Sequence, residues 1–181
     1  MNTGPGVMLN IVTRWILDNC KTTEQATKFL QKIPKTWGTA YLVIDKKDGI
    51  AKIEAHREKT KTTYADKGFE FVTLRFDSPE MEKYNAQDER GRWAFDTYSA
   101  RKPFLLSWFR QSKGSIDNEM IINALKSHEH KMCTHDYDGQ VHYGICWSWI
   151  LSPGKNEAVV CADPPCRNEF KKHDVSGYSN R

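Results

Sequence analysis

Membrane-length hydrophobic runs are missing from this chain of 181 residues. No apolar stretch approaches the roughly 18 residues of a helix that spans a bilayer. The first residues also lack the positively charged start and apolar core of a secretory signal. We therefore expect no contact with a membrane and a cytoplasmic location. The length itself is that of one domain of about 100–200 residues.

A strong excess of charge of one sign is missing as well. The chain has 27 Lys and Arg against 23 Asp and Glu, a formal net charge of +4, and the basic residues are scattered. The densest group, in residues 56–61, is typical of a solvated strand edge. We therefore expect no nucleic-acid partner. The alternative is a nucleic-acid module that uses Trp37, Trp93 and nearby basic side chains, and its affinity would fall steeply with salt.

The cysteines lack the spacing of a metal or redox motif. The chain contains Cys20, Cys133, Cys146, Cys161 and Cys166. Their number is odd and no C-x-x-C pair occurs, so reduced thiols are the simplest expectation. Cys133 and His135 are one residue apart, and Cys161 and Cys166 lie close together further on. Only the fold could bring these two pairs together, so we expect no metal site.

Motifs of common enzymes are also missing. The sequence has no Gly-rich phosphate loop, no nucleophile elbow and no paired-histidine metalloprotease motif, and we expect no cofactor. His128 and His130 would point to different sides of a helix. Cys133 and His135 would share a face of a strand, so a nucleophile and base pair is geometrically possible. An ordinary buried cysteine beside an edge histidine is the alternative.

What the sequence does contain is a central hairpin. Two short apolar runs in residues 38–54 flank the turn residues Asp48 and Gly49, a pattern typical of paired antiparallel strands. Asp45 and Glu54, near the ends of this hairpin, are expected to serve turn and strand-end hydrogen bonding. Two strands alone are barely stable in water, so other segments must extend and cover them.

The remaining predicted elements follow from periodicity, caps and turn residues. They are helices over residues 7–20 and 22–33, strands over 60–64 and 69–76, a loop or irregular helix over 80–97, helices over 99–109 and 115–125, and strands over 131–135, 143–151 and 157–163.

Three local signals set the helix boundaries. Thr22 and Gln25 form a capping box, and Pro34 ends the helix that follows it. Ser99 is the expected cap of a later helix, with Pro103 in its first turn. The order of helix pair, four strands, helix pair and three strands predicts an α+β fold in which helix pairs cover antiparallel sheets. We expect one domain over residues 1–170 and a polar tail over 171–181.

Seven short phrases also occur in a fixed order between residues 6 and 170. They are Arg14–Cys20 with Thr23, Ala26 and Ile33-Pro34; Tyr41–Asp45 with Ile53–Ala55; Phe76–Met81; Ser99 with Arg101; Met132-Cys133 with His135; Trp147–Ile150; and Asp163–Cys166. Together they resemble the C-terminal portion of the N-terminal-nucleophile (Ntn) hydrolases of the choloylglycine hydrolase and isopenicillin N acyltransferase type. The family usually spaces its Ser and Arg slightly wider than Ser99 and Arg101.

The resemblance implies a four-layer αββα fold that cleaves or transfers the acyl group of a linear amide. In that family the first residue of the mature chain is a cysteine nucleophile, and its own α-amine acts as the base. An α-amine has an ordinary pKa of about 7.7–8.0, so it accepts the thiol proton near neutral pH. Asparagine side chains and backbone N–H groups hold the developing oxyanion.

The sequence departs from the family pattern at two places. No cysteine stands near residue 1, and Cys20 lies at the end of a predicted helix. Where the family reads Asn-His-Phe, this chain reads Leu74-Arg75-Phe76. Leu74 cannot donate a hydrogen bond, and losing one oxyanion donor typically costs about 10²–10³ in rate. Arg101 carries over as a catalytic residue whose charge fixes the site; the alternative is a helix-start arginine paired with a surface carboxylate.

These points lead to one favoured hypothesis and one alternative. The favoured one is the C-terminal part of an Ntn-type amide hydrolase or acyltransferase that acts on linear C–N amide bonds, lacks the nucleophile segment and is inactive alone. Its partners would be the missing N-terminal segment, or a second copy of the chain, bound through an exposed strand edge, and a small amide or acyl substrate. The alternative is a non-catalytic relative that serves as a binding or assembly module.

Overall fold

The computed structural model describes residues 4–47, 49–65, 68–112, 114–135, 144–152 and 155–178. The chain divides into two compact units, Met1–Ser99 and Ala100–Arg181. Each unit holds one antiparallel sheet of three strands, so the predicted α+β class is confirmed. The single domain over residues 1–170 stays a prediction. None of the described helices is long and apolar enough to cross a bilayer.

The first sheet consists of β1 (Thr39–Ile44), β2 (Ile50–Ala55) and β3 (Thr60–Tyr64), in that order. β1 and β2 pair in the register Leu42↔Lys52, which confirms the central hairpin. Its turn residue Asp48 lies outside the described residues. The carboxylate of Asp45 accepts hydrogen bonds from the backbone N–H groups of its own turn, which is the role expected for it.

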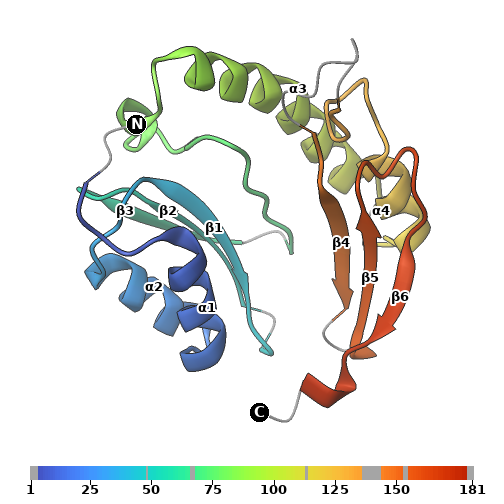
Figure 1. Cartoon of the computed structure of the whole chain (residues 1–181), viewed down its shortest axis with the longest axis horizontal. Helices are drawn as coiled ribbons and strands as arrows, with labels where there is room; N and C mark the ends of the chain where they lie inside the picture. The colour runs from blue at the N-terminus through green and yellow to red at the C-terminus, as the bar shows by residue number, and fades with distance from the viewer. Residues whose placement is uncertain are drawn as a thin grey trace. The chain divides into compact units, whose positions relative to one another are not determined.

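Helices α1 (Leu9–Asn19) and α2 (Thr23–Lys32) lie on one face of this sheet (Figure 1). Both were predicted, and the hydroxyl of Thr22 caps α2 by accepting a hydrogen bond from the N–H of Gln25 at 3.3 Å. Together with β2 they form one apolar core. Its buried members are Val12, Ile16, Ala26, Leu30, Ala51, Ile53 and Ala55.

The opposite face of β2 is covered by residues 69–78, which do not form the predicted strand. Their backbone is bound by side chains instead of by a strand ladder. The buried carboxylate of Glu54 accepts hydrogen bonds from the N–H groups of Asp77 and Ser78. The expected run of four strands therefore stops at three, and Glu54 serves hydrogen bonding as predicted.

Helix α3 (Glu89–Ser112) begins well before the predicted cap at Ser99, after a short 3-10 turn (Glu82–Tyr84). The cap is Asp88, whose carboxylate accepts a hydrogen bond from the N–H of Gly91 at 3.1 Å. The prediction for Ser99 was wrong, since its hydroxyl donates to the carbonyl of Phe95 within the helix. Pro103 consequently lies in the helix interior rather than in the first turn.

The second sheet consists of β4 (Trp147–Ser152), β5 (Glu157–Ala162) and β6 (Lys171–Asp174), in that order. β4 and β5 were predicted in position, although β4 begins later than expected. β6 lies in the segment expected to be a polar tail, and all four of its side chains are exposed. Its pairing with β5 therefore depends on backbone hydrogen bonds rather than on an apolar pattern.

Helix α4 (Asn118–Leu125) packs on one face of the second sheet. Its cap is Asp117, whose carboxylate accepts a hydrogen bond from the N–H of Met120 at 2.8 Å. After α4 the chain forms turns over residues 127–133 instead of the predicted strand over 131–135. The N–H of Cys133 donates back to the carbonyl of Ser127 at 2.9 Å, which closes this segment on itself.

Candidate functional site

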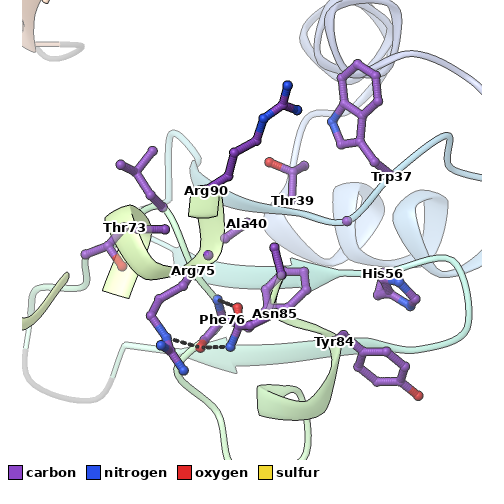
Figure 2. A pocket seen from close by; sticks show the side chains of 15 residues that line it. Trp37, Thr39, Ala40, His56, Thr73, Arg75, Phe76, Tyr84, Asn85 and Arg90 are labelled. Atoms are coloured by element: carbon purple, nitrogen blue, oxygen red, sulfur yellow. Dashed lines mark hydrogen bonds between the residues drawn. The ribbon is translucent and has the colours of Figure 1, made fainter. Parts of the chain in front are cut away.

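The first unit contains a cavity of about 330 Å³ beside β1. Its walls come from residues 37–40 at the start of β1, residues 73–76, and residues 84–94 leading into α3, with His56 at the end of β2 (Figure 2). Leu74 and Arg75, which stand where the resembled family has Asn and His, both line it. A volume of this size accommodates a small organic ligand.

One amide side chain fixes the wall formed by residues 73–76. The N–H of Phe76 donates to Asn85 Oδ1 at 2.8 Å, and Asn85 Nδ2 donates to the Phe76 carbonyl at 2.9 Å (Figure 2). Both polar groups of the Phe76 backbone are thereby satisfied by a single residue. The position of the neighbouring Leu74 and Arg75 depends on this contact.

A close backbone approach fixes a second wall. A Cβ atom at Gly91 would lie 1.8 Å from the carbonyl oxygen of Ala86, so only glycine fits at the first turn of α3. The chain can therefore turn sharply from residue 86 into the helix and bring Arg90 to the cavity.

The charged side chains that line the cavity are basic. Among the described residues that line it, Arg75 and Arg90 are basic and none is acidic. Arg75 Nη2 lies 3.3 Å from Glu82, and its guanidinium stands over the ring of Phe95 at 4.9 Å from the ring centroid. The Arg90 residue is exposed. Guanidinium groups bind carboxylates and phosphates through paired hydrogen bonds, so the cavity favours an anionic ligand.

The imidazole of His56 adds no positive charge. Burial, together with the nearby charges of Arg57 and Lys35, lowers the pKa of His56 below its ordinary value. Its Nδ1 accepts a hydrogen bond from the N–H of Glu58 at 3.3 Å, and its ring stacks on Tyr84. The ring is therefore neutral near neutral pH, and the positive charge of the cavity comes from the guanidinium groups.

A buried ion cluster supports the cavity wall from the sheet side. Lys52 Nζ lies 3.0 Å from Asp77 and 3.5 Å from Glu70. Although burial disfavours the ammonium, the hydrogen bond and charge of Asp77, with the charges of Glu70 and Glu54, raise the pKa of Lys52. The cluster joins β2 to residues 70–77, so these ion pairs fix the position of the cavity wall relative to the strand.

Four side chains that could hold a metal ion lie together in the second unit. They are His128, Cys133, His135 and Cys166, whose donor atoms all lie within 4.8 Å of one another. His135 Nε2 is 3.2 Å from His128 Nε2 and 3.2 Å from Cys166 Sγ. The fold thus brings Cys133, His135 and Cys166 together, which the sequence did not lead us to expect. Cys161 is buried in β5 and is not part of the cluster.

The predicted site residue Arg101 holds this cluster's loop in the second unit. Its Nε and Nη2 atoms both donate to the carbonyl of Lys131, at 2.8 and 2.6 Å. It lies in the middle of α3 rather than at a helix start, and burial lowers its pKa. The catalytic role of Arg101 stays a prediction, and the observed role of its guanidinium is to bind a turn.

Three thiols, those of Cys20, Cys133 and Cys161, are poorly suited to act as free nucleophiles. Burial raises the pKa of Cys20, Cys133 and Cys161. Cys20 is the C-cap of α1, so its backbone is part of a helix end. A raised pKa lowers the fraction of reactive thiolate near neutral pH.

Sequence reasoning missed most of the cavity. Asn85 and Arg90 were not identified as site residues, and Trp37 was named only for the nucleic-acid alternative, because these residues come from segments that only the fold brings together. The one usable signal was the departure at Leu74 from the family pattern, which pointed to the correct wall. His128 could have been noticed from its spacing ahead of Cys133 and His135.

Comparison with known proteins places most of the chain in one family. The family described as acyl-coenzyme A:6-aminopenicillanic acid acyl-transferase matches residues 2–146. No curated protein and no solved structure matches the chain. The matched range includes every described segment that lines the cavity.

Proposed function

Because the chain belongs to the acyl-coenzyme A:6-aminopenicillanic acid acyl-transferase family, we propose that it serves acyl transfer to an amine or hydrolysis of a linear amide. The cavity at residues 73–76 binds the substrate. The observation that carries this proposal is that the family match covers all the segments of this cavity, including Leu74 and Arg75.

The lining suggests how a substrate is held. The exposed guanidinium of Arg90 is available to an anionic group such as a carboxylate, while Trp37 and Leu74 offer apolar surface to the rest of the molecule. A site with apolar walls and a few polar groups that fix orientation is typical of small-molecule binding. The substrate class is therefore a small amide or acyl acceptor that carries a negative charge.

The nucleophile of the reaction comes from outside the elements described above. The chemistry of the resembled family needs a cysteine with a free α-amine. All five cysteines stand inside the printed sequence, where their nitrogens belong to peptide bonds. A cut before Cys20 would remove α1, whose Val12 and Ile16 belong to the core. We infer that this chain provides the substrate-binding part and is inactive without a segment that carries the nucleophile.

The four-layer αββα architecture belongs to the same proposal. In the second sheet, Trp149 and Leu151 are exposed and alternate along β4 with the buried side chains of Ser148 and Ile150. A sheet that keeps apolar side chains on its exposed face is what one half of that architecture presents to the other.

Leu74 favours a second candidate function. Its side chain is 48% exposed and lines the cavity, but it has no hydrogen-bond donor for an oxyanion. A relative that binds an anionic small molecule without transforming it would have no need of that donor. Such a binding module keeps the arginines and the cavity while the chemistry is lost.

Titration calorimetry with 6-aminopenicillanic acid, which carries a carboxylate and a free amine, tests the shared part of both candidates. We expect saturable binding that Arg90→Gln weakens about fivefold to thirtyfold, from the ~1–2 kcal/mol of a partly solvated charge-assisted hydrogen bond. Arg92→Gln is the matched control, since Arg92 lies on the same helical turn, is exposed and does not line the cavity. Equal weakening by both variants would contradict the proposed pose.

The same preparation tests the claim of inactivity. The chain alone is incubated with an acyl-coenzyme A and 6-aminopenicillanic acid, and products are followed by mass spectrometry. We expect no turnover above the uncatalysed rate. Robust turnover by the chain alone would show that one of its own residues acts as the nucleophile.

A further inference from the structure

We propose that His128, Cys133, His135 and Cys166 form a zinc site that holds the second unit together. The four donor atoms all lie within 4.8 Å of one another, although Cys166 is 31 positions from His135 in the sequence. Three of the donors belong to the loop that follows α4, and the fourth belongs to the turn that follows β5. This proposal does not depend on the proposed function.

The distances suit tetrahedral coordination. Zinc binds cysteine sulfur at about 2.3 Å and histidine nitrogen at about 2.0–2.1 Å, so donor atoms around one ion stand roughly 3.3–3.8 Å apart. The two 3.2 Å distances from His135 Nε2, to His128 and to Cys166, lie close to that range. Because all pairs fall within 4.8 Å, closure around an ion needs movements of only about 1 Å.

The donor set selects the metal. Two sulfurs and two imidazole nitrogens are typical of zinc, whereas calcium and magnesium require oxygen ligands. With four protein ligands the coordination sphere is complete, which is the pattern of structural rather than catalytic zinc. Cys133 is fully buried and Cys166 is half-buried, while His128 is exposed, so the ion would lie just below the surface.

The backbone around the loop is already arranged for such a site. The two hydrogen bonds from Arg101 bind the carbonyl of Lys131, which lies between His128 and Cys133. Lys131 itself has a φ of 53°, and its N–H donates to the His128 carbonyl at 2.9 Å. These contacts hold the loop in one conformation, so Arg101 acts as a positioning residue for the cluster.

The turn that carries Cys166 is fixed in a similar way. Asp163 has a φ of 62°, and the N–H of Arg167 donates to the carbonyl of Pro164 at 3.1 Å. These contacts hold the turn that carries Cys166 in one conformation.

The second unit has a small apolar core, which a bound ion would supplement. The buried apolar side chains among its described residues are few and mostly small: Cys133, Ile150, Ala158, Val159, Cys161 and Pro165. α4 has no buried residue. Small units with little apolar core commonly depend on a metal or disulfides for stability. A zinc ion would join the loop after α4 to the turn after β5.

Metal binding by the full chain tests the proposal. The reduced, metal-stripped protein is titrated with Zn²⁺ against a chromogenic chelator, and with Co²⁺ while the visible and near-ultraviolet spectrum is recorded. We expect one ion per chain, the d–d bands of tetrahedral cobalt and a thiolate-to-cobalt charge-transfer band. Zinc should also raise the temperature of unfolding. Octahedral cobalt, no thiolate band or no stoichiometric binding would overturn the proposal.

Variants assign the ligands. Cys166→Ser and His135→Gln should each weaken zinc binding by more than about a hundredfold, since loss of an outer contact alone costs about 10–100-fold. Cys146→Ser and His173→Gln, which change an exposed thiol and an exposed imidazole outside the cluster, should leave it unchanged.

One further variant guards against simple misfolding. Cys166→His keeps four potential ligands, so it should still bind cobalt tetrahedrally, with a weaker thiolate band. Metal affinity that survives unchanged in Cys166→Ser, or that Cys146→Ser lowers equally, would contradict the assignment. A disulfide between Cys133 and Cys166 that persists in the presence of both a reductant and Zn²⁺ would also contradict the assignment.

Discussion

Asn85→Ala is the substitution that most directly tests how the cavity wall is held. The side chain makes two hydrogen bonds to the backbone of Phe76, at 2.8 and 2.9 Å, and Phe76 is only 5% exposed. Each lost bond costs about 0.5–1.5 kcal/mol, and the buried N–H and C=O left without a partner add to this. We expect the first unit to lose about 2–3 kcal/mol of its free energy of unfolding.

Urea denaturation followed by tryptophan fluorescence measures this loss. With a urea m-value of about 1 kcal/mol/M for a unit of this size, the midpoint should fall by roughly 2–3 M. Affinity for 6-aminopenicillanic acid should fall too, because the wall that carries Leu74 and Arg75 is no longer fixed. The control is Gln87→Ala, whose exposed amide donates only to the Asn85 carbonyl among its described contacts. A loss below about 0.5 kcal/mol for Asn85→Ala would refute the reasoning.

Three further predictions concern single groups. Burial raises the pKa of Tyr41 to about 12. Because the unfolded chain loses this proton first, the free energy of unfolding should fall by up to ~2–3 kcal/mol as pH rises from about 10 to 12. Tyr41→Phe should abolish this alkaline loss in a pH series of thermal melts. Gly91→Ala should destabilise the first unit by about 1–3 kcal/mol despite the higher helix propensity of alanine, because the added Cβ would lie 1.8 Å from the Ala86 carbonyl oxygen. Gly177→Ala should be neutral in the same denaturation assay, because a Cβ at Gly177 would lie in open space. Arg101→Gln should weaken zinc binding by about tenfold in chelator competition, because the Lys131 carbonyl loses both donors; unchanged zinc affinity would leave the catalytic role as the better account of Arg101.

The parts of the fold that the sequence predicted are those set by local signals. The capping residue Thr22 and the stop at Pro34 define α2, and the paired apolar runs define β1 and β2. Each signal acts between residues close in sequence. The tertiary contacts of this chain therefore do not change the elements that these signals define.

The wrong predictions lie where residues distant in sequence determine the secondary structure or the helix boundary. Residues 69–76 have the apolar content of a strand, but Asn85 binds the backbone N–H of Phe76, and Glu54 binds the N–H groups of Asp77 and Ser78 that follow. Ser99 is a good capping residue, yet Asp88 and Gly91 start the helix earlier. A cap far upstream of Pro103 was not expected, because proline is usually found in a first helical turn.

The sites were less predictable than the fold for the same reason. Leu74 and Arg75 could be singled out through the family pattern, but no spacing rule links them to Trp37 or Arg90. The proposed zinc ligands illustrate this more strongly, because Cys166 is 31 positions from His135, and β4 and β5 lie between them in the sequence. The sequence has no C-x-x-C pair that would predict such a site.

We propose that this chain is the substrate-binding part of an acyl-transferring enzyme whose nucleophile is supplied by another segment. The most direct measurement joins the chain to an N-terminal segment with an exposed first cysteine, adds an activated acyl donor, and locates the acyl group by peptide mass spectrometry. The account predicts acylation of that cysteine, dependent on the chain and reduced by Arg90→Gln. No acylation, with 6-aminopenicillanic acid still bound, would contradict it and identify the chain as a binding module.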